Sequence, residues 1–414
     1  MPKFNSYCCS ICGSIYQPHE VTYICPKDGG NLDVTLDYDA IKKSVSQEKL
    51  ILSNEFSIWR YLPLLPVQDP GCLGTPLRSV GWTPLYHPNS IAKELKLDQL
   101  WLKDDGRNPS ASFKDRASAV MIARAREIKA EVVVTASTGN AGAALACMAA
   151  AANHKAVIFA PKTAPPAKVA QLLVFGAQVF LVDGNYDQAF DLAIQAAQEF
   201  GWYCRNTGYN PFTAEGKKTA AFEIWEQVII KNNLKKLLNV FVPVGDGNII
   251  SGIHKGFKDL QAMGWLSNRP RLFGVQAEGS AAIANAFFRK NEIIDAVKAT
   301  TLADSISVDL PRDGLRALRA VTQTGGRYIT VSDEEILAAI ARLGKTGIFA
   351  EPAASTAYAG LAKAVEQGII LPDDPVIVMI TGSGLKDVKA ATNAVQSAPI
   401  IEPTLNALKK ALEY

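Results

Sequence analysis

Short runs of β-branched and other apolar residues alternate with helical segments along most of this sequence, and that alternation limits the fold more than any other feature. Strands are expected at residues 99–103, 131–135, 156–160, 179–182, 239–244, 271–276 and 375–380. Helices are expected at residues 140–152, 167–175 and 186–200, and after a capping box at Ser332. Strands spaced by helices form βαβ units, whose parallel sheets are covered on both faces. We therefore expect two open three-layer α/β/α domains with mostly parallel sheets.

The chain of 414 residues is long enough for two such domains and one small additional module. Prolines recur between residues 38 and 85, so no long helix is expected there. The expected parts are a leader at residues 1–35, a large domain at 36–115 and 205–400, a small domain at 116–204, and a C-terminal tail at 401–414.

Two cysteine knuckles in the leader have the form of a zinc ribbon. Cys9 and Cys12 form the first knuckle, and Cys25 with Asp28 forms the second, where a fourth cysteine would be usual. Zinc accepts thiolate sulfur and carboxylate oxygen in a tetrahedral site, so these four residues are predicted to bind one ion, with Cys8 as a spare thiol. The alternative is a ribbon that keeps its hairpins without metal.

Residues 108–116, with the sequence NPSASFKDR, place Lys114 at the start of a helix. The Asn-Pro pair ends the preceding extended segment, and Ser112 with Asp115 is predicted to form a capping box. A lysine near the positive end of a helix dipole has a lowered pKa, which favours a nucleophile or Schiff-base former. The ordinary alternative is a solvated lysine on a helix.

Three predicted strands end in loops that suit a ligand. Residues 135–142 and 243–252 are rich in glycine and open helices, and Thr381 follows the strand at 375–380. Backbone N–H groups at a helix start suit an anion, and ligands of open α/β sheets bind beyond the carboxyl ends of the strands. Each loop alone also fits a tight strand-to-helix turn.

Together, these segments and the Gly-Leu-Lys-Asp run at residues 384–387 resemble the motifs of the threonine synthases, which use pyridoxal 5′-phosphate (PLP). That family's lysine motif is Asn-Pro-Ser/Thr-Gly-Ser-Phe-Lys-Asp-Arg, from which only Ala111 departs. The resemblance implies PLP fold type II with a zinc-ribbon-like leader. It also implies a carbon–oxygen lyase of threonine biosynthesis that converts O-phospho-L-homoserine and water to L-threonine and phosphate.

The resemblance implies a role for individual residues as well. Lys114 would hold PLP covalently and act as the general base. Asn140 would contact the phenolic oxygen of the cofactor, and Thr381 its pyridine nitrogen. The cofactor phosphate would lie on Gly245, Asp246, Gly247, Asn248 and Ile249, although Asp246 replaces an asparagine. The residues expected to face the substrate are Ser112, Ser137, Thr138, Asn206 and Lys218.

One departure concerns the substrate. Residues 205–219 resemble the family segment Asn-Ser-x-Asn-Pro-x-Arg-x-Glu-Gly-Gln-Lys-Thr, in which the arginine grips the substrate phosphate. Thr213 stands in its place and cannot supply a permanent charge, so Arg205, Lys217 or Lys218 would have to compensate. The same departure suits a PLP-dependent β-elimination or β-replacement enzyme, such as a serine/threonine dehydratase or a cysteate-synthase-like enzyme. A non-catalytic sensor or scaffold is a third alternative, which the intact lysine motif disfavours.

Composition bounds the remaining classes. A net charge of +3 without a basic run predicts no nucleic-acid partner, and no stretch resembles a signal peptide or membrane span. Seven cysteines, four of them crowded near the N-terminus, indicate metal binding or reduced thiols rather than a disulfide framework. We expect a cytoplasmic homodimer that acts on a small amino-acid substrate.

Overall fold

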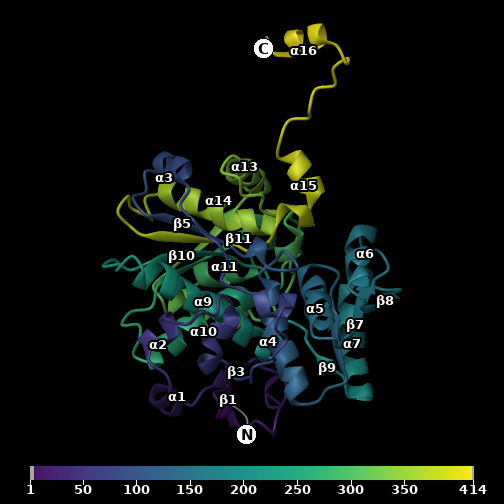
Figure 1. Cartoon of the computed structure of the whole chain (residues 1–414), viewed down its shortest axis with the longest axis vertical. Coiled ribbons are helices and arrows are strands. Elements are labelled where there is room, and N and C mark those ends of the chain that lie inside the picture. Colours follow the sequence, from purple (N-terminus) through teal and green to yellow (C-terminus); the bar gives the residue numbers. More distant parts are fainter. Residues whose placement is uncertain (1–3, 413–414) are drawn as a thin grey trace.

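The computed structural model describes residues 4–412 and groups their strands into three sheets (Figure 1). The orders are β2-β1-β3 in the leader, β8-β7-β6-β9 in the smaller main sheet and β12-β11-β10-β13-β5-β4 in the larger. The strands are β1 Ser6–Cys9, β2 Ile15–Tyr16, β3 Leu32–Thr35, β4 Leu85–Tyr86, β5 Leu100–Asp104, β6 Val132–Ala136, β7 Lys155–Pro161, β8 Gln178–Val182, β9 Tyr203–Cys204, β10 Asn239–Pro243, β11 Arg271–Ala277, β12 Tyr328–Val331 and β13 Val376–Ile380.

Helices cover both main sheets and connect their strands. They are α1 Tyr38–Ser44, α2 Gln47–Ile51, α3 Asn89–Leu95, α4 Lys114–Glu127, α5 Asn140–Ala151, α6 Pro166–Val174, α7 Tyr186–Phe200, α8 Phe212–Lys217, α9 Thr219–Ile224, α10 Asn248–Ala262, α11 Ala282–Phe288, α12 Gly314–Thr322, α13 Asp333–Gly344, α14 Pro352–Glu366, α15 Val388–Asn393 and α16 Leu405–Leu412.

The larger sheet is parallel except for β4, which runs antiparallel to β5 at one edge. Every residue of β5, β10 and β13 is buried, as expected for strands covered on both faces. Alternate residues serve the two faces: Val240 packs in the cluster with α10 and α12, whereas Phe241 packs with α13 and α14. The smaller sheet is parallel throughout. The predicted three-layer α/β fold is confirmed.

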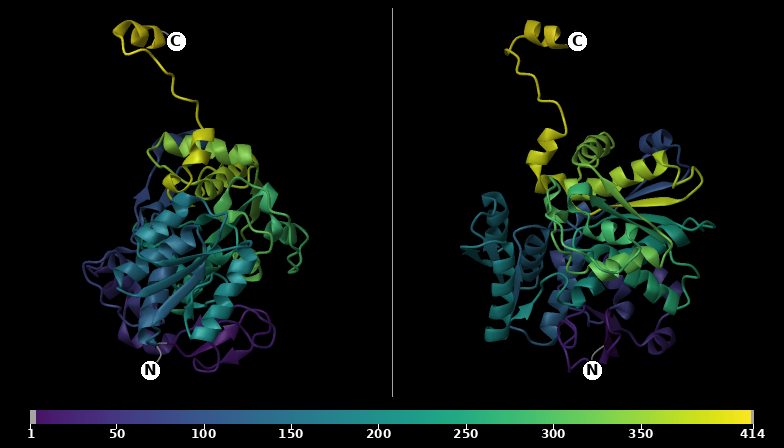
Figure 2. Two further views of the ribbon diagram at one scale, coloured as in Figure 1. Left: turned by 90° about the vertical axis from the view of Figure 1, so that its right-hand side faces the viewer. Right: turned by 180° about the vertical axis from the view of Figure 1, so that it is seen from behind.

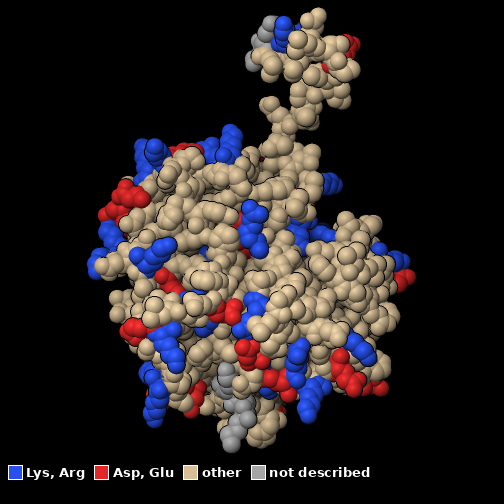
Figure 3. All heavy atoms as spheres, viewed as in Figure 1, with Lys and Arg blue, Asp and Glu red and all other residues tan. Residues whose placement is uncertain are grey.

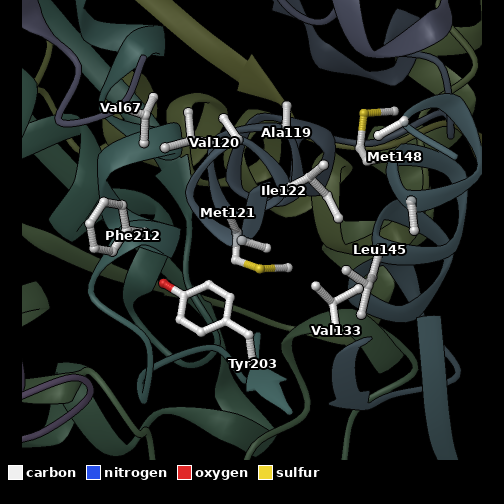
Figure 4. Packing of buried hydrophobic residues seen from close by; sticks show 14 of the residues in the cluster. Val67, Ala119, Val120, Met121, Ile122, Val133, Leu145, Met148, Tyr203 and Phe212 are labelled. Atoms are coloured by element: carbon white, nitrogen blue, oxygen red, sulfur yellow. The ribbon is translucent and has the colours of Figure 1, made fainter. Parts of the chain in front are cut away.

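Helix α4 joins the two main sheets, because it packs on α5 from one and on α8 from the other (Figure 4). Met121 and Ile122 are fully buried in this contact, beside Val133 of β6, Leu145 of α5 and Phe212 of α8. The first residue of α4 is Lys114, so the helix that carries the lysine motif is fixed on both sides.

The leader sheet packs against the same core. Tyr7, Leu32 and Val34 are buried in one apolar cluster with α4. The rings of Phe4 and Phe212 lie edge to face with centroids 5.7 Å apart. The leader is therefore packed into the body rather than appended to it.

Several local predictions meet different outcomes. The capping box at Ser332 forms with Glu335 and begins α13. In the two main sheets, three short strands, β4, β9 and β12, were not expected. The domain boundaries stay a prediction. Residues 1–3 of the predicted leader and residues 413–414 of the predicted tail lie outside the described residues.

Helix α16 lies away from the body in both views of Figure 2 and has no buried residue. Basic and acidic side chains are interspersed on the face shown in Figure 3. None of the helices in the described part of the chain has the length and apolarity of a membrane span.

Candidate active site

A cavity of about 640 Å³ lies where the carboxyl ends of strands from both main sheets meet. Strands β6 and β9 end there from the smaller sheet, and β10 and β13 from the larger. The cavity gathers residues of five separate sequence motifs: Lys114, Ser137, Thr138, Asn140, Arg205, Gly245, Asp246, Gly247, Asn248, Ile249 and Thr381.

Lys114 begins α4, but the predicted cap of this helix is wrong. The helix has no side-chain cap at its start, and the Ser112 hydroxyl is buried without a hydrogen-bond partner. The Asp115 carboxylate instead accepts hydrogen bonds from the backbone N–H of Ser110, at 2.6 Å, and from the Ser110 hydroxyl. The Asp115 carboxylate, and not the predicted cap Ser112, therefore stabilises the turn before Lys114.

The turn before Lys114 is hydrogen-bonded to the loop that follows β13. The Phe113 N–H donates to the carbonyl of Thr381 at 2.8 Å, and the Ser383 N–H donates to the carbonyl of Ala111 at 3.1 Å. Ala111 has a φ of 64°, a left-handed conformation that glycine adopts without penalty. The one departure from the family's lysine motif thus falls where the backbone favours glycine.

The environment of Lys114 favours its neutral amine. Burial lowers the pKa of Lys114, and the nearby Arg205 guanidinium lowers it further, against the opposite effects of Asp246 and Glu351. No carboxylate forms an ion pair with Lys114 among residues 4–412. This electrostatic setting suits an amine that takes up and returns protons near neutral pH.

The loop between β10 and α10 has the features of a phosphate cradle. Gly247 has a φ of 86° and precedes Asn248, the first residue of α10, whose start has no side-chain cap. A Cβ atom on Gly247 would lie 2.6 Å from that of Ala317, and one on Gly245 would lie 2.8 Å from the Ile306 Cα. Glycine at both positions lets the loop pack closely while helix N–H groups stay open to an anion.

Asp246 lines the cavity and neither turns outward nor caps α10. Its carboxylate accepts a hydrogen bond from the backbone N–H of Arg312 at 3.2 Å. Burial raises its pKa, which weakens its repulsion of an anion in the cradle.

Glu351 is a cavity residue that sequence reasoning missed. The Asn140 amide donates to both carboxylate oxygens of Glu351 at 3.0 Å, and burial raises the pKa of this carboxyl group. A Cβ atom on Gly382 would lie 2.3 Å from Glu351 Oε1, so the glycine makes room for the carboxylate. A Glu-Pro pair is common at the start of a helix, so nothing in the sequence indicates that Glu351 lies in the cavity.

Of the five residues expected to face the substrate, two line the cavity and three do not. Ser137 and Thr138 line the cavity. Ser112 is buried beside Lys114, and Asn206 is buried behind β6, where its Oδ1 accepts from the Ala136 N–H at 2.9 Å. Lys218 is not brought to the cavity.

The leader gathers its predicted metal ligands into one cluster. The ligand atoms of Cys9, Cys12, Cys25 and Asp28 all lie within 4.8 Å of one another. The Sγ atoms of Cys12 and Cys25 are 3.8 Å apart, which matches the edge of a tetrahedron with Zn–S bonds of about 2.3 Å. A Cβ atom on Gly30 would lie 2.7 Å from Cys9 Sγ, so glycine is required beside the cluster.

Comparison with known proteins identifies the family. Residues 77–382 match a family described as pyridoxal-phosphate dependent enzyme. The threonine synthase of Methanocaldococcus jannaschii is 40% identical over 408 residues, which cover 98% of each chain. The chain belongs to the threonine synthase family. The threonine synthase of Methanosarcina acetivorans is 36% identical over 410 residues, again 98% of each chain, and that of a Bacillus species is 37% identical over 81% of this chain and 92% of its own.

Solved structures agree with this family in fold. The tomato threonine deaminase isoform 2 superimposes with a TM-score of 0.65 at 23% identity, over 82% of this chain and 94% of its own. Maize serine racemase gives 0.62 at 20% identity, over 80% and 91%. The threonine synthase family member described here is therefore a PLP-dependent lyase of fold type II.

Proposed function

We propose that this chain converts O-phospho-L-homoserine and water to L-threonine and phosphate. The observation that carries the proposal is the convergence of Lys114, Asn140, Thr381 and the 245–249 loop on one cavity. The 40% identity to an archaeal threonine synthase over nearly the whole chain supports the same reaction.

The residues of the cavity fit PLP. The phosphate would lie on the open start of α10, where the buried Lys217 side chain donates a hydrogen bond to Asn248. Lys114 would bind the cofactor through its Nζ. Thr381 offers a hydroxyl at the end of β13, and Asn140 an amide across the cavity.

Bound PLP supplies an electron sink for negative charge at the substrate carbons. The Lys114 Nζ moves protons between the α and β carbons, since its lowered pKa keeps the amine able to accept them. Phosphate leaves the γ carbon, and water adds at the β carbon. Ser137 and Thr138, at the end of β6, orient the substrate with hydroxyl and backbone N–H groups.

The proposal is tested with holoenzyme and O-phospho-L-homoserine, by counting threonine and free phosphate together. We expect equal amounts of both from the wild type and neither from Lys114→Arg, which keeps the charge but not the amine chemistry. If cofactor-loaded protein releases no threonine, yet eliminates from serine, threonine or O-phosphoserine, then the dehydratase or β-replacement alternative replaces this one.

We also propose that Cys9, Cys12, Cys25 and Asp28 hold one zinc ion, because their ligand atoms lie within 4.8 Å of one another and the Cys12–Cys25 distance fits a tetrahedral site. A reducing, cytoplasmic location is supported by the seven free cysteines. A homodimer is supported by the exposed apolar side chains of Phe180 and Leu181 on the edge strand β8. Sedimentation analysis of the holoenzyme tests the dimer.

A further inference from the structure

The chain lacks a cation at the position where the threonine synthase motif has its phosphate-gripping arginine. Thr213 occupies that position, is fully buried and donates its hydroxyl hydrogen bond to the Asn210 carbonyl at 2.8 Å. A threonine this short cannot neutralise a phosphate dianion, which needs a cation within hydrogen-bond reach. Three cations of the same segment are available to replace it.

Lys218 is excluded because its charge is already balanced. Its ammonium pairs with the Asp259 carboxylate at 2.8 Å and also with Glu215, and all three side chains are buried. Two carboxylates in such a buried network already balance the lysine charge, and Lys218 is not among the residues that line the cavity.

Lys217 is directed to the first residue of α10 and is not among the residues that line the cavity. It lies one helical turn after Thr213, and its Nζ contacts Asn248 Oδ1, to which the Thr213 hydroxyl also lies close at 3.3 Å. Burial, with Lys114 and Arg205 nearby, holds the pKa of Lys217 well below its usual range, so Lys217 supplies no permanent charge in place of the missing arginine. Its contact with Asn248 places it beside the cradle for the cofactor phosphate.

Arg205 is the third candidate cation, and its surroundings suit the binding of an anion. It is fully buried, lines the cavity and has no ion pair with any carboxylate in the described chain. Its Nε donates to Ser118 Oγ at 3.2 Å and its Nη1 to Thr207 Oγ1 at 2.6 Å, whereas Nη2 is buried without a partner. An unpaired donor of this kind is costly to bury, so a ligand acceptor completes it.

The position of Arg205 suits the substrate rather than the cofactor. The residue follows β9, and its N–H donates to the Val134 carbonyl of β6 at 2.7 Å, so it lies beside the loop that begins at Thr135. Ser118, to which it is bound, lies one helical turn after Lys114. The guanidinium is therefore held close to the reacting lysine, whose pKa it lowers, and on the side of the smaller sheet.

We propose that Arg205 binds the phosphate group of the phosphorylated amino-acid substrate, in place of the arginine that Thr213 replaces. This inference rests on the proposed function. Ser118 and Thr207 fix the guanidinium before the substrate arrives, so little side-chain entropy is lost on binding. Burial lowers the pKa of Arg205 to about 10, so the side chain is charged at neutral pH.

The test uses the holoenzyme, in which the cofactor fills the cradle, and compares Arg205→Gln, Arg205→Lys and Lys217→Gln with the wild type. Three quantities are measured: KM and kcat for O-phospho-L-homoserine, the Kd of inorganic phosphate by titration calorimetry, and the Kd of L-threonine from the cofactor absorbance. We expect Arg205→Gln to raise KM and the phosphate Kd roughly 10- to 100-fold, the loss of one charge-assisted hydrogen-bonding group. The L-threonine Kd should stay within about twofold, since threonine carries no phosphate.

The other variants keep the inference falsifiable if Arg205→Gln does not fold. Arg205→Lys keeps the charge but cannot bond Ser118 and Thr207 together, so KM and the phosphate Kd should rise less, again without a change for threonine. Lys217→Gln should weaken cofactor binding and leave the phosphate Kd unchanged. The inference is overturned if Lys217→Gln raises the phosphate Kd and the Arg205 variants do not, or if the Arg205 variants weaken threonine and phosphate binding equally.

The proposed function and this inference fail in different ways. A wild type that makes no threonine from O-phospho-L-homoserine contradicts the proposed function. The phosphate Kd of the Arg205 variants still decides the role of Arg205 in that case.

Discussion

Arg316 of α12 holds Asp33 of the leader at 2.7 Å, between Nη1 and Oδ1. The same guanidinium forms two bonds with Asp313, and Asp313 Oδ2 accepts from Asn248 Nδ2 at 2.6 Å. Polar contacts thus run from the leader to the first residue of α10. The leader contributes to the position of the cradle although it does not line the cavity.

We expect Asp33→Asn to weaken PLP binding severalfold and to lower the free energy of unfolding by about 1 kcal/mol, because Arg316 keeps Asp313 but loses a charged partner. Cofactor titration followed by fluorescence and unfolding in urea measure the two effects. Asp39→Asn, at an exposed position of α1, is the matched control. Equal cofactor affinity in both variants would contradict a role for the leader in positioning the cradle.

The metal cluster predicts one zinc per chain, measured by elemental analysis of purified protein. Cys12→Ser should abolish bound zinc and lower the free energy of unfolding by about 3 kcal/mol when free zinc is 100 times its Kd. Cys8→Ser should retain the metal, since the Cys8 thiol is not in the cluster. Loss of zinc from both variants, or from neither, is the result that would refute this ligand set.

Ala111→Gly should stabilise the protein by about 0.5 kcal/mol. The left-handed conformation costs alanine about 1–2 kcal/mol, which glycine avoids. Glycine in turn loses about 0.5–1 kcal/mol more conformational entropy on folding, so only part of this gain remains. Ala150→Gly, at an exposed position in the regular helix α5, should instead destabilise by about 1 kcal/mol. Urea unfolding of the two variants decides the prediction by the opposite signs of their effects.

The lowered pKa of the buried His254 predicts that the protein loses stability in acid. Burial, with Lys258 and Arg269 nearby, lowers its pKa to about 3, although Asp33 acts in the opposite direction. The native state therefore binds fewer protons than the unfolded chain, so stability falls as the pH drops below about 6.5, by up to about 1.4 kcal/mol per pH unit, and continues to fall towards pH 3.

His254→Gln should flatten this decline between pH 6.5 and 5, measured by urea unfolding at several pH values. His19→Gln, at an exposed position in the leader, should keep the wild-type slope. An unchanged slope in His254→Gln would assign the acid sensitivity to other groups.

The sheets were predictable because buried parallel strands need continuous apolar runs, and seven such runs stand out in the sequence. Strand β12 escaped notice because Tyr328–Val331 is short and only partly apolar. The two-residue strands β4 and β9 carry no periodicity at all. They are defined by the neighbours with which they pair.

The cavity was predictable in outline because its motifs end strands, whereas its electrostatics were not. Glu351 reaches Asn140 only through the tertiary fold. Of the three cations that were candidates to replace the missing arginine, only the structure distinguishes the paired Lys218 from the unpaired Arg205. Sequence alone supplies charges, but not which of them are already neutralised.

The packing of Phe4 on Phe212 has a practical consequence for anyone trimming this chain. The segment that matches the PLP-dependent family begins at residue 77, and a shortened chain could be designed to start there. It would remove Phe4, Tyr7 and Val34 from the apolar cluster that includes the helix that carries Lys114. The segment from residue 77 onward, which the family match delimits, is therefore not a self-contained unit of this fold.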